Sequence, residues 1–241
     1  MKLKQYIKYV LVLILLVLLG FLYGFTSKRN QQKKITKVTI EFTGNYTHFL
    51  THKMVDKLLI QKQKSLKNQP KSTLNLYGLE AKVLKNPYVE EAVVYVTIDG
   101  ELKSIIKQRT PILRIVAKNN SYYVDKQGVY IPLSDSYSAR VPLVFGVEKK
   151  EDVVKVTELM NVILADNFLK KEIVGIQRFN KNEYQFTVRS GNYKIDFGKL
   201  DNVALKFKKL RAFYNKAFLD KTIKQYKTIN LKFHNQVVCT K

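Results

Sequence analysis

Residues 86–114 read NPYVEEAVVYVTIDGELKSIIKQRTPILR, and this stretch decides how the chain is organised. Two runs of alternating apolar residues flank Asp99-Gly100, a pair that can supply the positive φ values of a tight hairpin turn. Alternation places every second side chain on one side of an extended strand. On that side lie Ala92, Val94, Val96 and Ile98 before the turn, and Leu102, Ser104, Ile106 and Gln108 after it. The stretch therefore predicts a β-hairpin. Pro111 has no N–H, so we expect it to end or kink the second strand.

The composition describes a basic chain that can build a core. Its 241 residues are 46% hydrophobic and 12% aromatic, which excludes a disordered chain. The formal net charge of +24 would attract nucleic acid, anionic lipid, an acidic polymer or an acidic protein, and charge alone does not choose among them. Cys239 is the single cysteine, so the fold contains no internal disulfide.

An uncharged run, Tyr9–Ser27, predicts a membrane-spanning helix near the N-terminus. At about 1.5 Å per residue this run spans roughly 28 Å, close to the ~30 Å hydrocarbon thickness. Residues 1–8 would form a cytoplasmic head, and residues 28–34 a polar juxtamembrane linker. The anchor residues that we single out are Tyr9, Leu13, Leu16, Leu19 and Tyr23, with the tyrosines near the interfaces.

A cleaved signal peptide is the alternative for this run. Its apolar region would be about 7–15 residues long and followed by a small-x-small cleavage site. The run here is longer, and Phe25-Thr26-Ser27 is a poor cleavage site, which favours an uncleaved anchor. Lysine and arginine stand on both sides of the run, so charge alone leaves the orientation open. A short basic head before a long folded tail favours translocation of the tail.

The region before the hairpin completes a small α+β unit over residues 35–114. An alternating run, Lys34–Phe42, predicts a strand. Two helical patterns follow, His52–Gln63 with Thr51 as its N-cap and Leu76–Leu84, which Asn86-Pro87 stops. The order strand, helix, helix, strand, strand allows two helices to cover one face of a three-stranded sheet.

Residues 115–241 predict a second domain, mixed and largely antiparallel, with two helices. Asp125-x-x-Gly128 lies between two short apolar runs, which is a hairpin signal. The expected helices are Glu151–Leu169 and Asp201–Phe218, each with an apolar stripe at helical spacing. The expected strands after the first hairpin are Glu172–Phe179, Tyr184–Arg189, Tyr193–Phe197 and a last pair over Thr228–Cys239.

These motifs, in this order, resemble the FtsQ/DivIB cell-division family. The Asn86-Pro87-Tyr88-Val89 start, the Gly turn and the Gln108-Arg109 end resemble a POTRA domain. The Tyr123-Val124-Asp125-Lys126-Gln127-Gly128 run and the Ile229–Val238 tail resemble motifs of the family's second domain. The tail departs from the family pattern, with Asn230 for the usual Asp and Lys232 for the usual Arg.

The resemblance implies a non-catalytic, cofactor-free scaffold of the bacterial division machinery that acts during septum formation. It would sit in the cytoplasmic (inner) membrane at the division site, with its N-terminus in the cytoplasm and its bulk outside, in the periplasmic or equivalent space. Partners would be FtsB/FtsL-type coiled-coil proteins and other division proteins, captured by strand addition along an edge strand at Thr228–Val238. Candidate partner-binding residues are Ile229, Leu231, Lys232, Phe233, Asn235, Gln236 and Val237. Lys232 could pair with a partner carboxylate, though without the bidentate fork of Arg.

The sequence offers little for catalysis or for a metal. His48 and His52 are four residues apart, but Thr51 is expected to cap the helix, which leaves His48 in a loop. Cys239 and His234 lie too near the C-terminus for a preorganised nucleophilic pair. We therefore expect neither an enzyme nor a metal site.

Three other functions fit the same residues less well. A POTRA-containing translocation or chaperone protein would be expected to carry amphipathic barrel strands, and none follow. A membrane-tethered hydrolase of the envelope would need a polar catalytic cluster, and the sequence shows none. A basic nucleic-acid-binding membrane protein would use the aromatics interleaved with lysines near Phe207–Tyr226, but their helical spacing favours a core stripe with a solvated rim.

Overall fold

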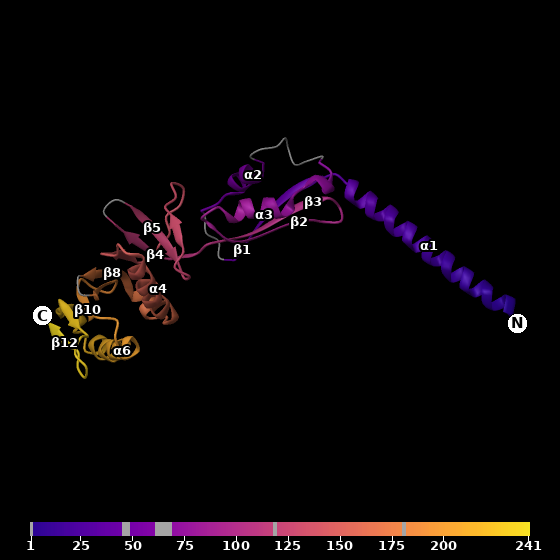
Figure 1. Cartoon of the computed structure of the whole chain (residues 1–241). Coiled ribbons are helices and arrows are strands. Elements are labelled where there is room, and N and C mark those ends of the chain that lie inside the picture. Colours follow the sequence, from indigo (N-terminus) through magenta and orange to yellow (C-terminus); the bar gives the residue numbers. More distant parts are fainter. Residues whose placement is uncertain (1, 45–48, 61–68, 118–119, 180–181) are drawn as a thin grey trace. The chain divides into compact units, whose positions relative to one another are not determined.

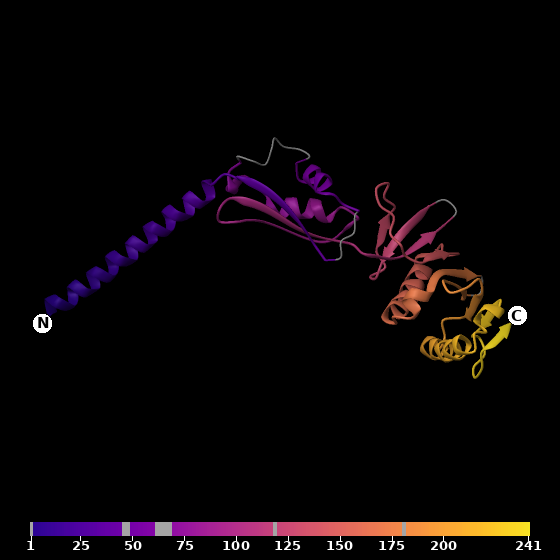
Figure 2. The same cartoon turned by 180° about the vertical axis from the view of Figure 1, so that it is seen from behind.

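The computed structural model describes residues 2–44, 49–60, 69–117, 120–179 and 182–241. The chain is α+β and divides into two compact units (Figures 1 and 2). The first comprises Met1–Tyr46 and Leu50–Gln108, and the second comprises Thr47–Phe49 and Arg109–Lys241. The division after Gln108 comes six residues before the expected boundary at 114/115, because the strand that contains Pro111 pairs entirely within the second unit.

The first unit has three strands and two covering helices behind a long N-terminal helix. Its elements are α1 (Lys2–Gln32), β1 (Lys37–Thr43), α2 (His52–Ile60), the 3-10 turn η1 (Lys71–Thr73), α3 (Leu76–Leu84), β2 (Val89–Val96) and β3 (Glu101–Gln108). The sheet order is β1-β3-β2, with β1 parallel and β2 antiparallel to β3. Both α2 and α3 bury apolar side chains in one cluster with the sheet, including Val55, Leu59, Leu79 and Val83.

Helix α1 is longer than the sequence predicted. It continues through Lys28 and Arg29 to Gln32, so most of the expected 28–34 linker is helical. The apolar side chains of its central part are exposed on every face, as in Leu13 at 63% and Leu19 at 53%. A helix that is apolar all round lacks the single stripe by which a helix packs on a core.

The hairpin is confirmed, with one difference at its tip. The inward side chains of β3 are Leu102, Ser104, Ile106 and Gln108, all at most 4% exposed. The alternation places Ile98 on one side with Ala92 and Val94, which are buried, but Ile98 is 80% exposed. The reason is that β2 ends at Val96, so that residues 97–100 form the turn, with Gly100 N–H donating to the Thr97 carbonyl at 3.2 Å. Gly100 has φ of 87°.

Helix α2 begins as predicted. The Met54 N–H donates to Thr51 Oγ1 at 3.4 Å, a side-chain contact of the N-cap kind. The expected continuation to Gln63 lies outside the described residues.

The second unit is one nine-stranded mixed sheet with helices packed against it. Its elements are β4 (Pro111–Val116), β5 (Ser121–Asp125), β6 (Tyr130–Pro132), β7 (Leu143–Phe145), α4 (Lys150–Ala165), α5 (Leu169–Glu172), β8 (Ile173–Phe179), β9 (Glu183–Val188), β10 (Lys194–Gly198), α6 (Val203–Leu219), η3 (Ile223–Gln225), β11 (Thr228–Asn230) and β12 (Val238–Thr240). The strand order is β12-β11-β10-β9-β8-β7-β4-β5-β6. Pro111 thus begins β4 rather than ending the hairpin.

One core holds these elements together. Helix α4 contributes Val156, Met160 and Ile163 to it, and every one of them is fully buried. Helix α6 contributes Phe207, Leu210, Tyr214 and Ala217, as its predicted stripe requires. The rings of Phe207, Phe186 and Phe197 pack together, with centroids 4.9 to 6.2 Å apart, so the aromatics of α6 are core residues.

A buried carboxylate explains the Asp125-x-x-Gly128 motif. Asp125, 2% exposed, accepts at Oδ1 from the N–H groups of Gln127 and Val129, at 3.0 and 2.8 Å. Its Oδ2 accepts from Arg109 Nη1 at 2.7 Å. The side chain therefore shapes the β5–β6 turn and holds Arg109, the first residue of the long segment Arg109–Lys241 of the second unit.

Replacing Arg109 by Met should destabilise the second unit by about 3–5 kcal/mol, because the buried Asp125 charge loses its partner. The measurement is denaturant-dependent hydrogen exchange of the β5 amides. Arg211→Met is the control, since it removes a surface pair with Asp166 whose arginine side chain is 52% exposed and should cost less than about 1 kcal/mol. Equal losses for the two variants would contradict the role given to Asp125.

Alanine substitutions at two glycines distinguish the cost of backbone strain from the cost of a steric clash. Gly128→Ala meets no atom within 4 Å, so only its φ of 82° opposes the change and the cost should be about 1 kcal/mol. Gly100→Ala adds a Cβ at 2.7 Å from the Lys34 carbonyl oxygen, and should cost about 2–4 kcal/mol. Hydrogen exchange of β3 for Gly100→Ala and of β5 for Gly128→Ala measures both effects.

Candidate partner-binding edge

An open sheet has two edge strands, and here they are β6 and β12. An edge strand leaves backbone N–H and C=O groups available to another chain. Strand β6 ends at Pro132, which has no N–H to offer and so blunts that edge. Strand β12 contains no proline and is the edge that can accept a further strand.

The last pair of strands predicted over Thr228–Cys239 is confirmed as β11 and β12. The partner-binding edge was expected to be a single strand over Thr228–Val238. That expectation is wrong, because the segment forms two strands of three residues joined by a turn. Strand β11 pairs in parallel with β10 on one side and antiparallel with β12 on the other, so it is an interior strand. The free edge is therefore Val238–Thr240.

The predicted partner-binding residues separate into two groups. Ile229 and Leu231 are 0% exposed and belong to the core of the second unit, so they cannot touch a partner without unfolding it. The remaining predicted residues lie in the turn between β11 and β12. Lys232, Phe233, Asn235 and Gln236 are exposed, and Val237 is half-buried.

The turn between β11 and β12 is held by one lysine of α6. Lys209 Nζ donates to the carbonyl oxygens of Leu231 at 3.4 Å and His234 at 3.2 Å, and also to that of Phe233. Three carbonyls that face one ammonium group fix the path of the turn. The Leu231 N–H donates to the Asp196 carbonyl at 2.9 Å and ties the start of the turn to β10.

Lys232 is engaged within its own chain. Its Nζ lies 2.8 Å from Glu183 Oε2, with both side chains more than a third exposed. The aliphatic stem covers Gly198, where an added Cβ would lie 2.9 Å from Lys232 Cγ. The free protein therefore already gives Lys232 a carboxylate partner, which any partner carboxylate would have to replace.

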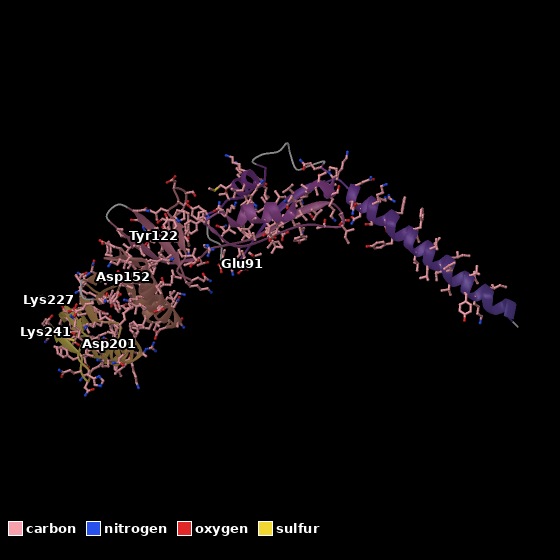
Figure 3. The ribbon with its side chains drawn as sticks, in the orientation of Figure 1. Glu91, Tyr122, Asp152, Asp201, Lys227 and Lys241 are labelled. Atoms are coloured by element: carbon pink, nitrogen blue, oxygen red, sulfur yellow. The ribbon has the colours of Figure 1, made fainter. Side chains whose placement is uncertain are left out.

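The charges around the edge are basic. Lys227 directly precedes β11 and Lys241 directly follows β12, and both are at the same end of these strands (Figure 3). The backbone joins them, since the Lys227 N–H donates to the Thr240 carbonyl at 2.8 Å. Burial raises the pKa of the Cys239 thiol, which lies on β12 itself.

The sequence missed Lys209 and Glu183. The helical spacing of α6 puts Lys209 beside the apolar stripe, and nothing local shows that this side of the helix faces a turn more than twenty residues later. Glu183 begins β9, far from Lys232 along the chain. The order of the strands in the sheet brings Glu183 and Lys232 together, and their spacing in the sequence does not reveal this.

The described residues contain no group of three or more His, Cys, Asp or Glu side chains that could hold a metal ion. His48 lies outside these residues. The His52 ring packs edge-on against Phe42, with centroids 4.9 Å apart.

Comparison with known families decides the assignment. A family model described as FtsQ/DivIB, C-terminal related, matches residues 110–240, which is more than half of the chain. The chain belongs to the FtsQ/DivIB family. A second model, a POTRA-like domain, matches residues 33–107 and so covers the sheet and helices of the first unit. This FtsQ/DivIB protein is thus a cell-division protein with the predicted domain types in the predicted order.

A solved structure is also similar to this FtsQ/DivIB protein. It is the major extracytoplasmic domain of the trans isomer of the bacterial cell division protein DivIB from Geobacillus stearothermophilus. The match has 11% sequence identity and a TM-score of 0.31, and covers 48% of this chain and 98% of that one. The comparison with curated proteins gave no match.

The N-terminal helix completes the family architecture. Within the described residues, Ile7–Gln32 of α1 is the one helix long and apolar enough to cross a membrane, by length and composition. The singled-out anchor residues all lie on it and are exposed, from Leu19 at 53% to Tyr23 at 77%. A single-pass membrane anchor fits these features.

Replacing Lys209 by Met should loosen the β11–β12 turn without unfolding the core. Removal of the ammonium group leaves three carbonyls to water, so we expect the amides of residues 232–238 to exchange about tenfold faster. Lys208→Met is the matched control, because Lys208 is its exposed neighbour on α6. An equal exchange rate in the two variants would contradict the role of Lys209 in holding the turn.

Proposed function

We propose that this protein is a bitopic scaffold of the bacterial division machinery that captures other division proteins at the β12 edge during septum formation, without catalysis of its own. The observation that carries the proposal is a free edge strand beside a turn fixed by Lys209. A rigid edge loses little conformational entropy when a strand is added, which favours capture.

The topology proposed is an N-terminal cytoplasmic head, one membrane span in the cytoplasmic membrane, and both folded units outside the cytoplasm at the division site. The length of α1 and the family assignment support this arrangement. In that position the folded units could meet the outer segments of other single-pass division proteins.

The partner proposed is a strand-forming segment of a small coiled-coil division protein of the FtsB/FtsL type. Two exposed apolar side chains lie at the edge, Phe233 in the turn at 47% and Val238 on β12 at 37%. Lys227, Lys232 and Lys241 surround it, so a partner strand that carries carboxylates is favoured. Ile229 and Leu231 act only from within, as the core that supports β11.

The Phe233→Lys, Asn235→Glu double variant should abolish co-purification with the coiled-coil partners, because it removes the apolar contact and changes charge beside the edge. Leu219→Lys is the control, since Leu219 is an exposed apolar residue, at 82%, at the end of α6. Cooperative melting must be retained in both variants. Unchanged co-purification of the double variant would remove this turn from the interface.

Two further readouts test the same proposal. Alkylation of Cys239 reports on β12 directly. Its raised pKa keeps the thiol protonated up to a higher pH than usual. The alkylation rate should therefore be slow at neutral pH, increase only at a pH above the ordinary thiol pKa, and be lower still when partner is bound.

Depletion of the protein should give filamentous cells and a tagged copy should gather at mid-cell. Normal division after depletion would contradict the proposal.

A further inference from the structure

The first unit has a defined membrane end. Strand β1 follows α1 and runs parallel to β3, with Lys37 opposite Glu101 and Thr43 opposite Lys107. The chain therefore leaves the membrane helix at the same end of the sheet as the β2–β3 turn. We call residues 33–36, 69–71 and 97–100 together the membrane-end surface.

Hydrogen bonds tie these three segments together. The Ile35 N–H donates to the Gln69 carbonyl at 2.9 Å, and the Lys71 N–H donates to the Lys33 carbonyl at 2.8 Å. On the other side, the Thr36 N–H donates to the Gly100 carbonyl at 2.9 Å. Ile35 itself is 0% exposed. The residues that directly follow α1 are thus an integral part of the folded unit.

The geometry of α1 places this surface close to the lipid. The apolar run ends at Ser27 and the helix at Gln32. Those last residues rise roughly 7 Å, which is about the depth of the headgroup layer on one side of a bilayer. Lys33 therefore emerges where the headgroups meet water.

The turn at the membrane end carries an apolar tip between two ammonium groups. Ile98 is 80% exposed at that tip. Lys33 Nζ donates to the Ile98 carbonyl at 2.9 Å, and Lys71 Nζ donates to the Thr97 carbonyl at 3.5 Å. An exposed branched side chain next to lysines held in place has the composition of a segment that lies in a membrane interface.

We propose that the membrane-end surface docks on the anionic lipid headgroups around α1, with Ile98 inserted at the interface and Lys33 and Lys71 on the headgroups. Lys28 and Arg29 add positive charge within the headgroup layer and Lys34 adds it beside Lys33, against one exposed carboxylate at the tip, Asp99. Because α1 holds the surface at the bilayer, docking is an intramolecular event with a high effective concentration. It does not depend on partner capture at β12 or on which side of the membrane the units occupy.

The test uses the full chain in lipid vesicles with a fluorophore on Ile98→Cys, in a Cys239→Ser background. A nitroxide-bearing lipid in the same bilayer should quench this label strongly when phosphatidylglycerol is present, and less in phosphatidylcholine alone. Thr43→Cys is the matched label site, exposed at the opposite end of β1, and should show no quenching by the lipid.

Charge removal tests the lysines. Lys33→Gln with Lys71→Gln should lower the ratio of docked to undocked protein about 25-fold, at about fivefold for each charge near an anionic surface. The control is Lys85→Gln with Lys107→Gln, which removes the same charge from the far end of the sheet and should change nothing. Equal quenching of the labels at positions 98 and 43 would overturn the proposal. Quenching at position 98 that is the same with and without phosphatidylglycerol would also overturn it. If the tip instead binds a protein partner and not lipid, the label at position 98 should be quenched no more than the label at position 43.

Discussion

An open β-sheet leaves two rows of backbone donors and acceptors without partners, and this constraint shapes the second unit. At β6, the strand is short and ends on Pro132, so little remains to attract another chain. Strand β12 is equally short but contains no proline. Natural sheets protect their edges against unwanted pairing, so an edge left available in a well-packed unit is a feature to explain. The proposed capture of a partner strand would explain it.

Polar groups, rather than apolar area alone, set the path of the chain at three of its turns. Asp125 forms the turn before β6 and holds Arg109 at the start of the second unit. Lys209 holds the turn before β12 through three carbonyls. In the first unit Lys33 and Lys71 meet the carbonyls of the β2–β3 turn. Each device uses a charged donor or acceptor, which makes stronger hydrogen bonds than neutral groups and so fixes a loop in one geometry.

The two ends of the chain carry different features. The first unit is continuous with the membrane helix through Ile35, which would allow its hairpin tip to meet the bilayer as proposed. The second unit carries the free edge and its basic surroundings. A division protein with this arrangement would be anchored at one end and available for partners at the other, with the high net charge of +24 serving both lipid and acidic protein surfaces.

The sequence by itself determined the element types, the hairpin and the family, because hydrophobic period, turn residues and helix caps are local signals. Its alternation placed Leu102 and Ile106 on one side of a strand, and the structure buries that side. The sequence predicted a pair of strands over Thr228–Cys239, but it could not show that Ile229 faces the core while β12 is the edge. Strand order is decided by which distant segments pair, and no local pattern contains it. Only the tertiary structure therefore brought Lys209 to the last turn. It also left Ile98 exposed at the tip of the hairpin formed by β2 and β3.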